Sequence, residues 1–138
     1  MPKKKNAYYL IFLFIIIIIL VLFLLLASSN KKNDLNDSKN IDKIKQTNQI
    51  VIQVDNKQEK IIKDKQSINT IIRIILDSKK ENGFVNLDGT TKKIILYDSN
   101  NNTIFRIKVW NNGYFGFNAK EYKIQSKDLD TFIRIIEE

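Results

Sequence analysis

The first feature of the hydropathy pattern is one long apolar run, "LIFLFIIIIILVLFLLLA", at residues 10–27. These 18 residues contain no charge, no amide and no glycine. At about 1.5 Å per residue, such a helix is roughly 27 Å long, close to the ~30 Å hydrocarbon core of a bilayer. Tyr8 and Tyr9 precede the run and suit the membrane interface. The pattern predicts a transmembrane helix at 10–27 that binds the lipid bilayer.

The next segment, residues 28–48, is polar and carries charges of both signs. With so few apolar residues it is not expected to bury a core. The sequence predicts a flexible stalk here, with at most a transient helical turn around Ile41 and Ile44. Residues 49–138 would then form the folded domain.

Short runs with a period of two residues begin at Gln49. "QIVIQVD" reads as a strand, "DNKQ" as a turn and "EKIIKD" as a short return strand. Four more strands are expected at residues 90–98, 102–110, 113–118 and 121–125, and Asn112-Gly113 is a strong hairpin signal. In the second of these four, Phe105, Ile107 and Val109 share one face, whereas Arg106 and Lys108 share the other.

The first of two expected helices lies between these strand groups. Ile68, Ile71, Ile72 and Ile75 follow the spacing of one apolar helical face. Asp64 is the expected N-cap, with Ser67 as the alternative. Lys79, Lys80 and Gly83 suit the C-terminal end of the helix. A strand is the competing interpretation of "TIIRIIL", but the cap and the length favour a helix.

The closing segment, "SKDLDTFIRIIEE", predicts the second helix, with Ser126 as its N-cap. Leu129, Phe132, Ile133 and Ile136 form its apolar face. The expected fold class is therefore α+β, with a mostly antiparallel sheet and two amphipathic helices packed on one face.

The apolar run is either retained as an anchor or removed as a signal peptide. Its length favours retention, but Ala27-Ser28-Ser29 offers small residues for cleavage near Ser29. Three lysines within the basic tail, residues 1–9, favour a cytoplasmic N-terminus. A long C-terminal domain is translocated largely regardless of its charge. We expect residues 1–9 inside and 49–138 outside the cell membrane.

Charge changes this picture little. The chain carries +8 overall, but residues 30–138 hold 20 basic and 15 acidic residues, a balance of +5 (20 − 15). Such a balance suits anionic lipid or a wall polymer near a membrane. The charges are interspersed, as on an ordinary solvated surface.

The composition excludes several kinds of chemistry, since the chain has no histidine and no cysteine. Nucleophile–histidine catalysis, most zinc and haem sites and lipid attachment through cysteine are therefore ruled out. "NLDGTTK" reads as a turn rather than a calcium loop. The carboxylate pair Asp128 and Asp130, like the pair Glu137 and Glu138, fits a helix end. We predict no enzyme activity, no cofactor and no metal site.

The strand alternation suggests one candidate binding surface. If Ile107 points inward, the opposite face of the sheet carries basic and aromatic side chains. These candidate ligand-binding residues are Tyr97, Arg106, Lys108, Trp110 and Tyr114. They would suit a peptide, a glycan or a lipid head group. The alternative is that the aromatic residues are cross-strand pairs or lie beneath the "GFVNLDG" loop. Nucleic acid is not an expected partner, because an exported domain seldom meets it.

The order of segments also resembles a loose group of uncharacterised membrane-anchored or secreted α+β domains of low-GC Gram-positive bacteria. The resemblance covers about residues 49–136 and rests on the "INTIIRIILDSKK" helix, the "KIILYD" strand and the "SKDLDTFIRII" helix. It implies location and fold, not mechanism. The expected function is that of a membrane-anchored extracytoplasmic module that binds a protein, a peptide or an envelope component. The alternative is a secreted inhibitor or immunity-type protein.

Overall fold

The chain consists of two units, which we describe separately. The computed structural model describes residues 3–32, 34–87 and 89–138. One unit ends at residue 33, and the other is the domain Asp34–Glu138. The domain thus begins at Asp34, whereas the sequence predicts a start at residue 49.

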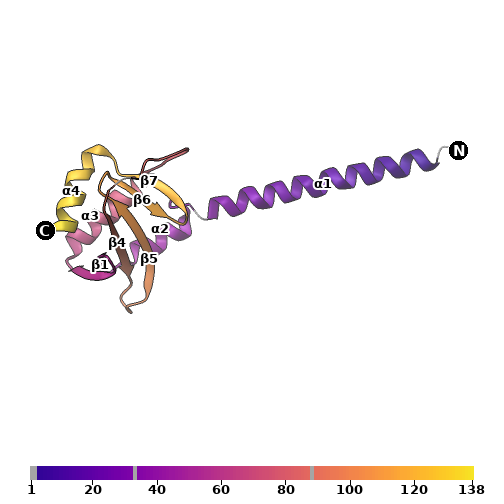
Figure 1. The fold of residues 1–138 in the computed structure, drawn as a ribbon. Helices are drawn as coiled ribbons and strands as arrows, with labels where there is room; N and C mark the ends of the chain where they lie inside the picture. Colours follow the sequence, from indigo (N-terminus) through magenta and orange to yellow (C-terminus); the bar gives the residue numbers. More distant parts are fainter. Residues whose placement is uncertain (1–2, 33, 88) are drawn as a thin grey trace. The chain divides into compact units, whose positions relative to one another are not determined.

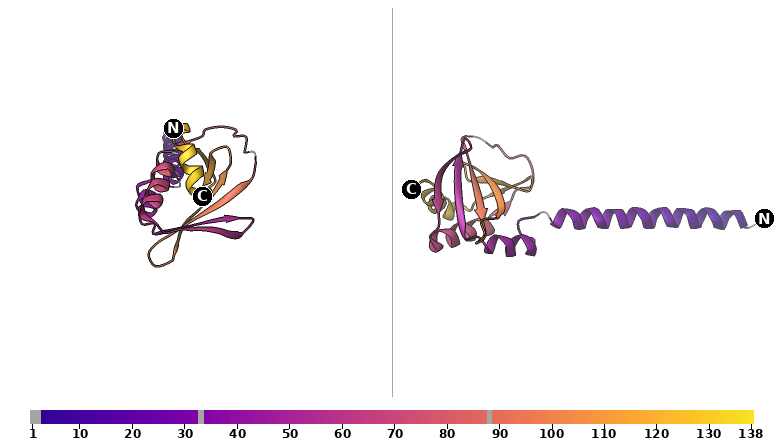
Figure 2. Two further views of the ribbon diagram at one scale, coloured as in Figure 1. Left: turned by 90° about the vertical axis from the view of Figure 1, so that its left-hand side faces the viewer. Right: turned by 90° about the horizontal axis from the view of Figure 1, so that it is seen from below.

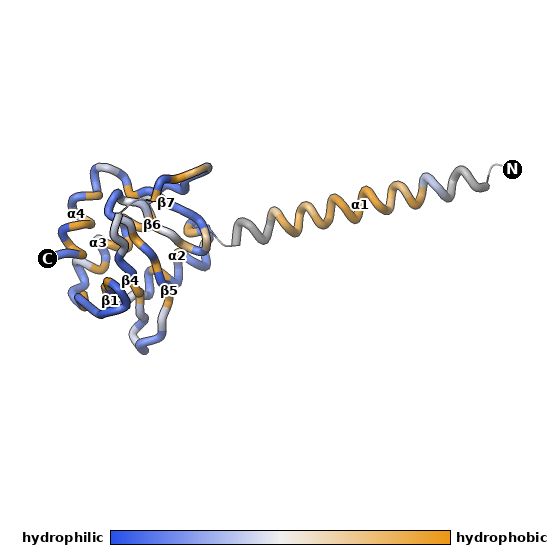
Figure 3. The backbone as a smooth tube through the Cα atoms, in the orientation of Figure 1, coloured by the Kyte–Doolittle hydropathy of each residue, from blue (hydrophilic) through white to orange (hydrophobic). Residues whose placement is uncertain are grey.

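The N-terminal unit is a single helix, α1 (Lys3–Lys32). Its segment Tyr8–Ala27 is long and apolar enough to cross a membrane, and none of that segment is buried against protein. Figure 3 shows most of this segment as the continuous orange part of the helix. The expectation of an apolar N-terminal helix is confirmed, and the helix continues beyond residue 27.

The described residues of the domain form three helices and one seven-stranded sheet (Figure 1). The helices are α2 (Ser38–Lys45), α3 (Lys65–Leu76) and α4 (Ser126–Glu137). The strands are β1 (Gln49–Val54), β2 (Lys57–Ile62), β3 (Lys79–Lys80), β4 (Thr91–Tyr97), β5 (Thr103–Trp110), β6 (Tyr114–Phe117) and β7 (Lys120–Lys123). The strand order is β2-β1-β4-β5-β6-β7-β3, and each neighbouring pair is antiparallel. The predicted α+β class is therefore correct.

The core lies between the helices and one face of the sheet, which we call the inner face. Ile50, Ile94 and Leu96 of β1 and β4 are completely buried there. Together with Ile71 of α3 and Phe132 of α4 they belong to one hydrophobic cluster. Figure 2 shows the strong twist of the sheet, which lets its inner face wrap around the helices. The three described helices contribute their buried apolar side chains to this inner cluster. On the other side of the sheet, the outer face, Val51 and Ile95 are also buried.

Helix α3 begins where the sequence predicted, because the side chain of Asp64 accepts a hydrogen bond from the Ser67 N–H at 2.8 Å. This bond holds the pKa of Asp64 below its usual value. The helix ends earlier than expected, at Leu76. Lys79 and Lys80 leave the helix because they form β3, which pairs with the distant strand β7. Helix α4 also differs, since Gln125 and not Ser126 is its N-cap residue.

The expected stalk is wrong for residues 34–48, which belong to the domain. They include α2, whose N-cap residue Asp37 accepts a hydrogen bond from the Lys39 N–H at 2.9 Å. Leu35 and Ile44 are completely buried in the hydrophobic cluster. Two apolar side chains at suitable positions therefore attach an otherwise polar segment to the core.

Two turns border the outer face, and both form where the sequence predicts a turn. Asp55 and Asn56 link β1 to β2 with φ values of 49° and 62°, a left-handed conformation that Asp and Asn tolerate. Gly113 links β5 to β6 with φ 83°, and its N–H donates to the Trp110 carbonyl at 3.0 Å. A Cβ atom at position 113 would lie 2.9 Å from Leu129 Cδ1, so it would have to displace the end of that side chain of α4.

Candidate functional site

The outer face is built by the side chains that alternate with the core residues. Ile94 and Ile107 pair across β4 and β5 on the inner face, so Lys93 and Lys108, which also pair, lie on the outer face. The register extends this face over β1, β6 and β7. Its residues include Gln53, Thr91, Lys93, Arg106, Lys108, Trp110, Tyr114, Gly116, Glu121 and Lys123.

A row of residues, all of them polar except Gly116, crosses the outer face from β1 to β7. It runs from Gln53 through Lys93, Lys108 and Gly116 to Glu121. Lys93 and Lys108 are direct cross-strand partners, and like charges in that position destabilise a sheet. Lys93 donates a hydrogen bond to Asn56 Oδ1 at 3.0 Å. Sheet stability alone does not account for this pair of lysines.

Two lysine–aromatic pairs lie beside that row. The Lys108 ammonium is 5.1 Å from the centre of the Trp110 ring, and the Lys123 ammonium is 5.1 Å from the centre of the Tyr114 ring. Both distances are within the range of cation–π attraction. Trp110 and Tyr114 are both half-buried. The outer face therefore presents positive charge next to partly accessible ring surfaces.

The end of the Trp110 ring lies next to Gly116 of β6 on this face. A Cβ atom at position 116 would lie 3.6 Å from Trp110 Cη2 and 3.6 Å from Cζ3, which is ordinary van der Waals distance. The indole therefore reaches across from β5 to the backbone of β6.

A shallow hollow of about 280 Å³ lies at the β1 end of the row. It is lined by Gln53, Asp55, Asn56, Thr91, Lys92, Lys93 and Lys108. Its volume is slightly below the ~300–1,000 Å³ that is usual for small-molecule pockets. The hollow suits part of an extended ligand, with Lys93 and Lys108 in position to meet an anionic group.

The structure brings four of the five predicted site residues together. Trp110 and Tyr114 lie at one end of the face, and Lys108 and Arg106 follow along β5. Tyr97 does not join them. It pairs with Thr103 at the far end of β4, six residues from Thr91, which is roughly 20 Å of strand. Lys93 was not among the predicted site residues. The alternation that places Ile94 on the inner face nevertheless also places Lys93 on the outer face.

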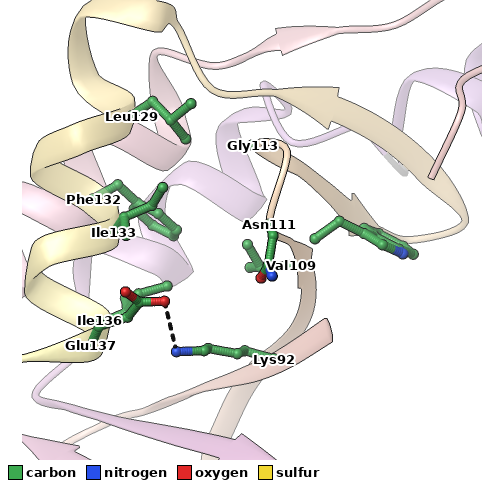
Figure 4. Close-up of a pocket in the computed structure, with 10 residues that line it drawn as sticks. Lys92, Val109, Asn111, Gly113, Leu129, Phe132, Ile133, Ile136 and Glu137 are labelled. Atoms are coloured by element: carbon green, nitrogen blue, oxygen red, sulfur yellow. Dashed lines mark hydrogen bonds and ion pairs between the residues drawn. The ribbon is translucent and has the colours of Figure 1, made fainter. Parts of the chain in front are cut away.

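A second, smaller cleft of about 190 Å³ lies on the inner side, between α4 and the β5–β6 turn (Figure 4). Leu129, Phe132, Ile133 and Ile136 of α4 point into it, opposite Val109. At its edge the Lys92 ammonium forms an ion pair with Glu137 at 3.2 Å. The cleft is mostly apolar and small, so it is a packing gap between the helix and the hairpin rather than a pocket for a drug-sized ligand.

Several charged groups elsewhere in the domain form ion pairs. Arg73 binds Asp128 Oδ1 at 3.0 Å and Asp77 at 3.3 Å, and the hydrogen bond to Asp128 is the main reason that the pKa of Arg73 is raised. The other oxygen of Asp128 is buried and has no hydrogen-bond partner among the described groups. Within the described ranges, no group of three or more acidic side chains could hold a metal ion.

An ion-pair cluster at the start of the domain ties its first residue to the sheet. Asp34 Oδ1 lies 2.6 Å from the Lys120 ammonium and 3.1 Å from that of Lys80. The hydrogen bond from Lys120 holds the pKa of Asp34 below its usual value. Next to it, the Leu35 N–H donates to the Tyr122 hydroxyl at 2.9 Å, and burial raises the pKa of Tyr122.

Comparison of this chain with models of known protein families, with curated proteins and with solved structures found no match. The α+β fold and the outer face therefore rest on the geometry of this chain itself.

Proposed function

We propose that this chain is a single-pass membrane protein whose outer face binds an anionic polymer of the cell envelope. The observation that carries the proposal is the cross-strand lysine pair, Lys93 and Lys108, beside the ring of Trp110. The polymer's phosphate or carboxylate groups would lie against the lysines. Its sugar or polyol units would lie against the aromatic rings.

The charge balance of the outer face supports an anionic ligand. On β1 and β4–β7 its basic residues are Lys93, Arg106, Lys108 and Lys123, against Glu121 on β7, a balance of +3 (4 − 1), and Lys79 of β3 pairs with Lys123 at the edge of the sheet. An anion between Lys93 and Lys108 would relieve their mutual repulsion. The ring of Trp110 is half-buried next to Gly116, so part of its surface stays accessible to a ligand. A peptide or protein ligand is the competing possibility, and it would not require a polyanion.

The anchor supports a location next to the envelope. The apolar segment Tyr8–Ala27 is long enough to span a bilayer. Lysines precede it in the sequence and favour a cytoplasmic N-terminus, so Asp34–Glu138 would lie outside. The proposed module therefore stands where it can meet polymers attached to, or surrounding, the membrane.

The topology is tested with a C-terminal tag on the full chain in intact cells. We expect an uncleaved, membrane-bound species whose tag is removed by protease added from outside. A shortened species in the medium would contradict the anchor and favour the secreted inhibitor or immunity-type protein. A full-length band that the protease cannot reach would reverse the orientation.

Binding is tested with the purified chain in micelles and poly(glycerol phosphate) as the polyanion, with neutral dextran as the reference polymer. Lys108→Glu is expected to weaken binding by about tenfold to a hundredfold, because a hydrogen bond to a charged group is worth about 1.5–3 kcal/mol. The new glutamate pairs with Lys93, so the sheet is expected to keep its stability. Binding should also weaken as salt is added.

The matched control is Lys65→Glu, the same charge change on an exposed residue in the first turn of α3, on the helix side of the domain. It should leave binding within about twofold of the unmodified chain, since exposed charges far from the ligand are screened. Trp110→Ala should weaken binding while the domain stays folded. Equal losses in Lys108→Glu and Lys65→Glu would show a non-specific charge effect, and retained binding in Lys108→Glu would exclude the outer face.

A further inference from the structure

We propose that the loop between β3 and β4 inserts Phe84 into the head-group region of the bilayer that α1 spans. This inference rests on the membrane anchor proposed above, but not on the polymer ligand. It assigns a role to residues 81–87, which lie outside the strands and outside the hydrophobic cluster. Figure 2 shows the loop arching out from the strands.

The side chain of Phe84 is exposed to a degree that is rare for phenylalanine. Its relative exposure is 103%, so no part of the domain covers the ring. Among the described residues of Asp34–Glu138, Ile61 is the other large apolar side chain classed as exposed, at 43%. Val85 and Leu87, next in the same loop, are only half-buried. The loop therefore places an apolar cluster, led by a bare aromatic ring, at the surface.

The covalent tether limits the distance between the domain and the bilayer. The membrane segment ends at Ala27 and the domain begins at Asp34, only seven residues later. A fully extended chain of this length spans at most about 25 Å, and a helix is shorter. A domain of roughly 100 residues has a radius of gyration of about 13 Å. The domain surface around Asp34 is thus confined to the neighbourhood of the head groups.

The loop starts beside that tether point. The Lys80 ammonium lies 3.1 Å from Asp34 Oδ1, and Lys120 on the neighbouring side binds the same oxygen. Phe84 follows Lys80 by four residues, which is at most about 14 Å of chain. The ion-pair cluster therefore holds the base of the loop at the end of the domain that the anchor keeps near the membrane.

The chemistry of the surrounding residues matches a bilayer surface. Lys31 and Lys32 follow the membrane segment in the sequence, and Lys79, Lys80, Lys120 and Lys123 lie on β3 and β7 next to the loop base. Lysines near a membrane attract anionic head groups, and an aromatic ring favours the interface. Asp34, Glu81 and Glu121 lie among the four lysines of the loop base, which therefore keeps a small positive balance of +1 (4 − 3). A positive surface with an exposed apolar side chain is the combination that interfacial anchors use.

The experiment uses tryptophan as a depth probe. Trp110 is the only tryptophan of the chain, so Trp110→Phe provides a background without this fluorophore. In that background, Phe84→Trp reports on the loop and Ile61→Trp is the matched control on the exposed part of β2. The full chain is reconstituted into vesicles of phosphatidylcholine and phosphatidylglycerol, with or without lipid brominated in the upper acyl chain. Flotation of the same samples reports whether the chain is anchored.

We expect the Phe84→Trp chain to float with the vesicles, to emit at shorter wavelength than in micelles, and to lose most of its emission in brominated lipid. The Ile61→Trp chain should float equally and keep its emission. Flotation without quenching of Phe84→Trp, or with equal quenching of both variants, would overturn the loop inference and leave the anchor intact. A chain that does not float would overturn the anchor and the loop inference together.

Discussion

Replacing Ile44 with alanine is expected to lower the free energy of unfolding of the domain by about 2–5 kcal/mol. Ile44 is completely buried, and it lies in a segment that is otherwise polar. The substitution removes three methyl or methylene groups from the core and leaves a cavity between α2 and its neighbours. For a domain of this size, the loss corresponds to a drop of about 10 °C or more in the midpoint of thermal unfolding.

The control for this prediction is Ile41→Ala on the same helix. Ile41 is only half-buried, and both substitutions change the intrinsic helix propensity of α2 in the same way. The difference between the two midpoints therefore isolates burial. Thermal unfolding of the full chain in micelles is followed through the fluorescence of Trp110. If both variants unfold within about 2 °C of the unmodified chain, residues 34–48 behave as a loose stalk and the description of α2 as part of the core fails.

Replacing Tyr122 with phenylalanine is expected to cost about 1–3 kcal/mol, a drop of about 5–20 °C in the same midpoint. The hydroxyl of Tyr122 accepts a hydrogen bond from the buried Leu35 N–H at 2.9 Å. Phenylalanine keeps the ring and its stacking on Phe115, whose centre lies 5.4 Å away. It leaves the Leu35 N–H without this acceptor, and a buried donor without a partner carries its full desolvation penalty.

Tyr114→Phe is the matched control, because it deletes the same atom from a residue of the neighbouring strand on the outer face. We expect this variant to unfold within about 2 °C of the unmodified chain, since most surface substitutions change stability by less than 0.5 kcal/mol. Amide hydrogen exchange supplies a second measurement. In Tyr122→Phe the Leu35 amide should exchange faster than in the unmodified chain. Equal exchange in both proteins would show that the hydroxyl does not hold the start of the domain.

These two predictions concern the same structural feature, the attachment of residues 34–48 to the rest of the domain. Leu35 hydrogen-bonds Tyr122 of β7, Asp34 binds Lys80 and Lys120, and Ile44 enters the core. The contacts leave few residues between the membrane segment and the folded domain. In the membrane-anchored chain that we propose, this short connection would restrict the orientations of the domain, and the proposed orientation has the β3–β4 loop toward the lipid.

Several elements could be predicted because their signal is local. The run at residues 10–27 needs no partner to be read as a helix that can span a membrane. The alternation of Phe105, Ile107 and Val109 with charged residues placed β5 and its two faces correctly, and the isoleucine spacing did the same for α3. Local spacing determines which side of an element is apolar, and this was enough to place Arg106, Lys108, Trp110 and Tyr114 on one face of the sheet.

The features that the sequence left open depend on partners far away in the chain. Lys79 and Lys80 read as the end of a helix, but their pairing with β7, more than 40 residues later, makes them a strand. Tyr97 shares a face with Trp110, yet the position of each residue along its strand separates them.

By itself, the sequence determined the apolar helix, the α+β class and the faces of the main elements, because each follows from periodicity within a few turns or residues. Only the tertiary structure decided that residues 34–48 belong to the domain, that Lys93 faces Lys108 and that Phe84 is left uncovered. The physical reason is that burial and cross-strand register depend on which distant side chains meet. Leu35 and Ile44 join a largely polar segment to the domain because the rest of the core provides the surface on which they pack.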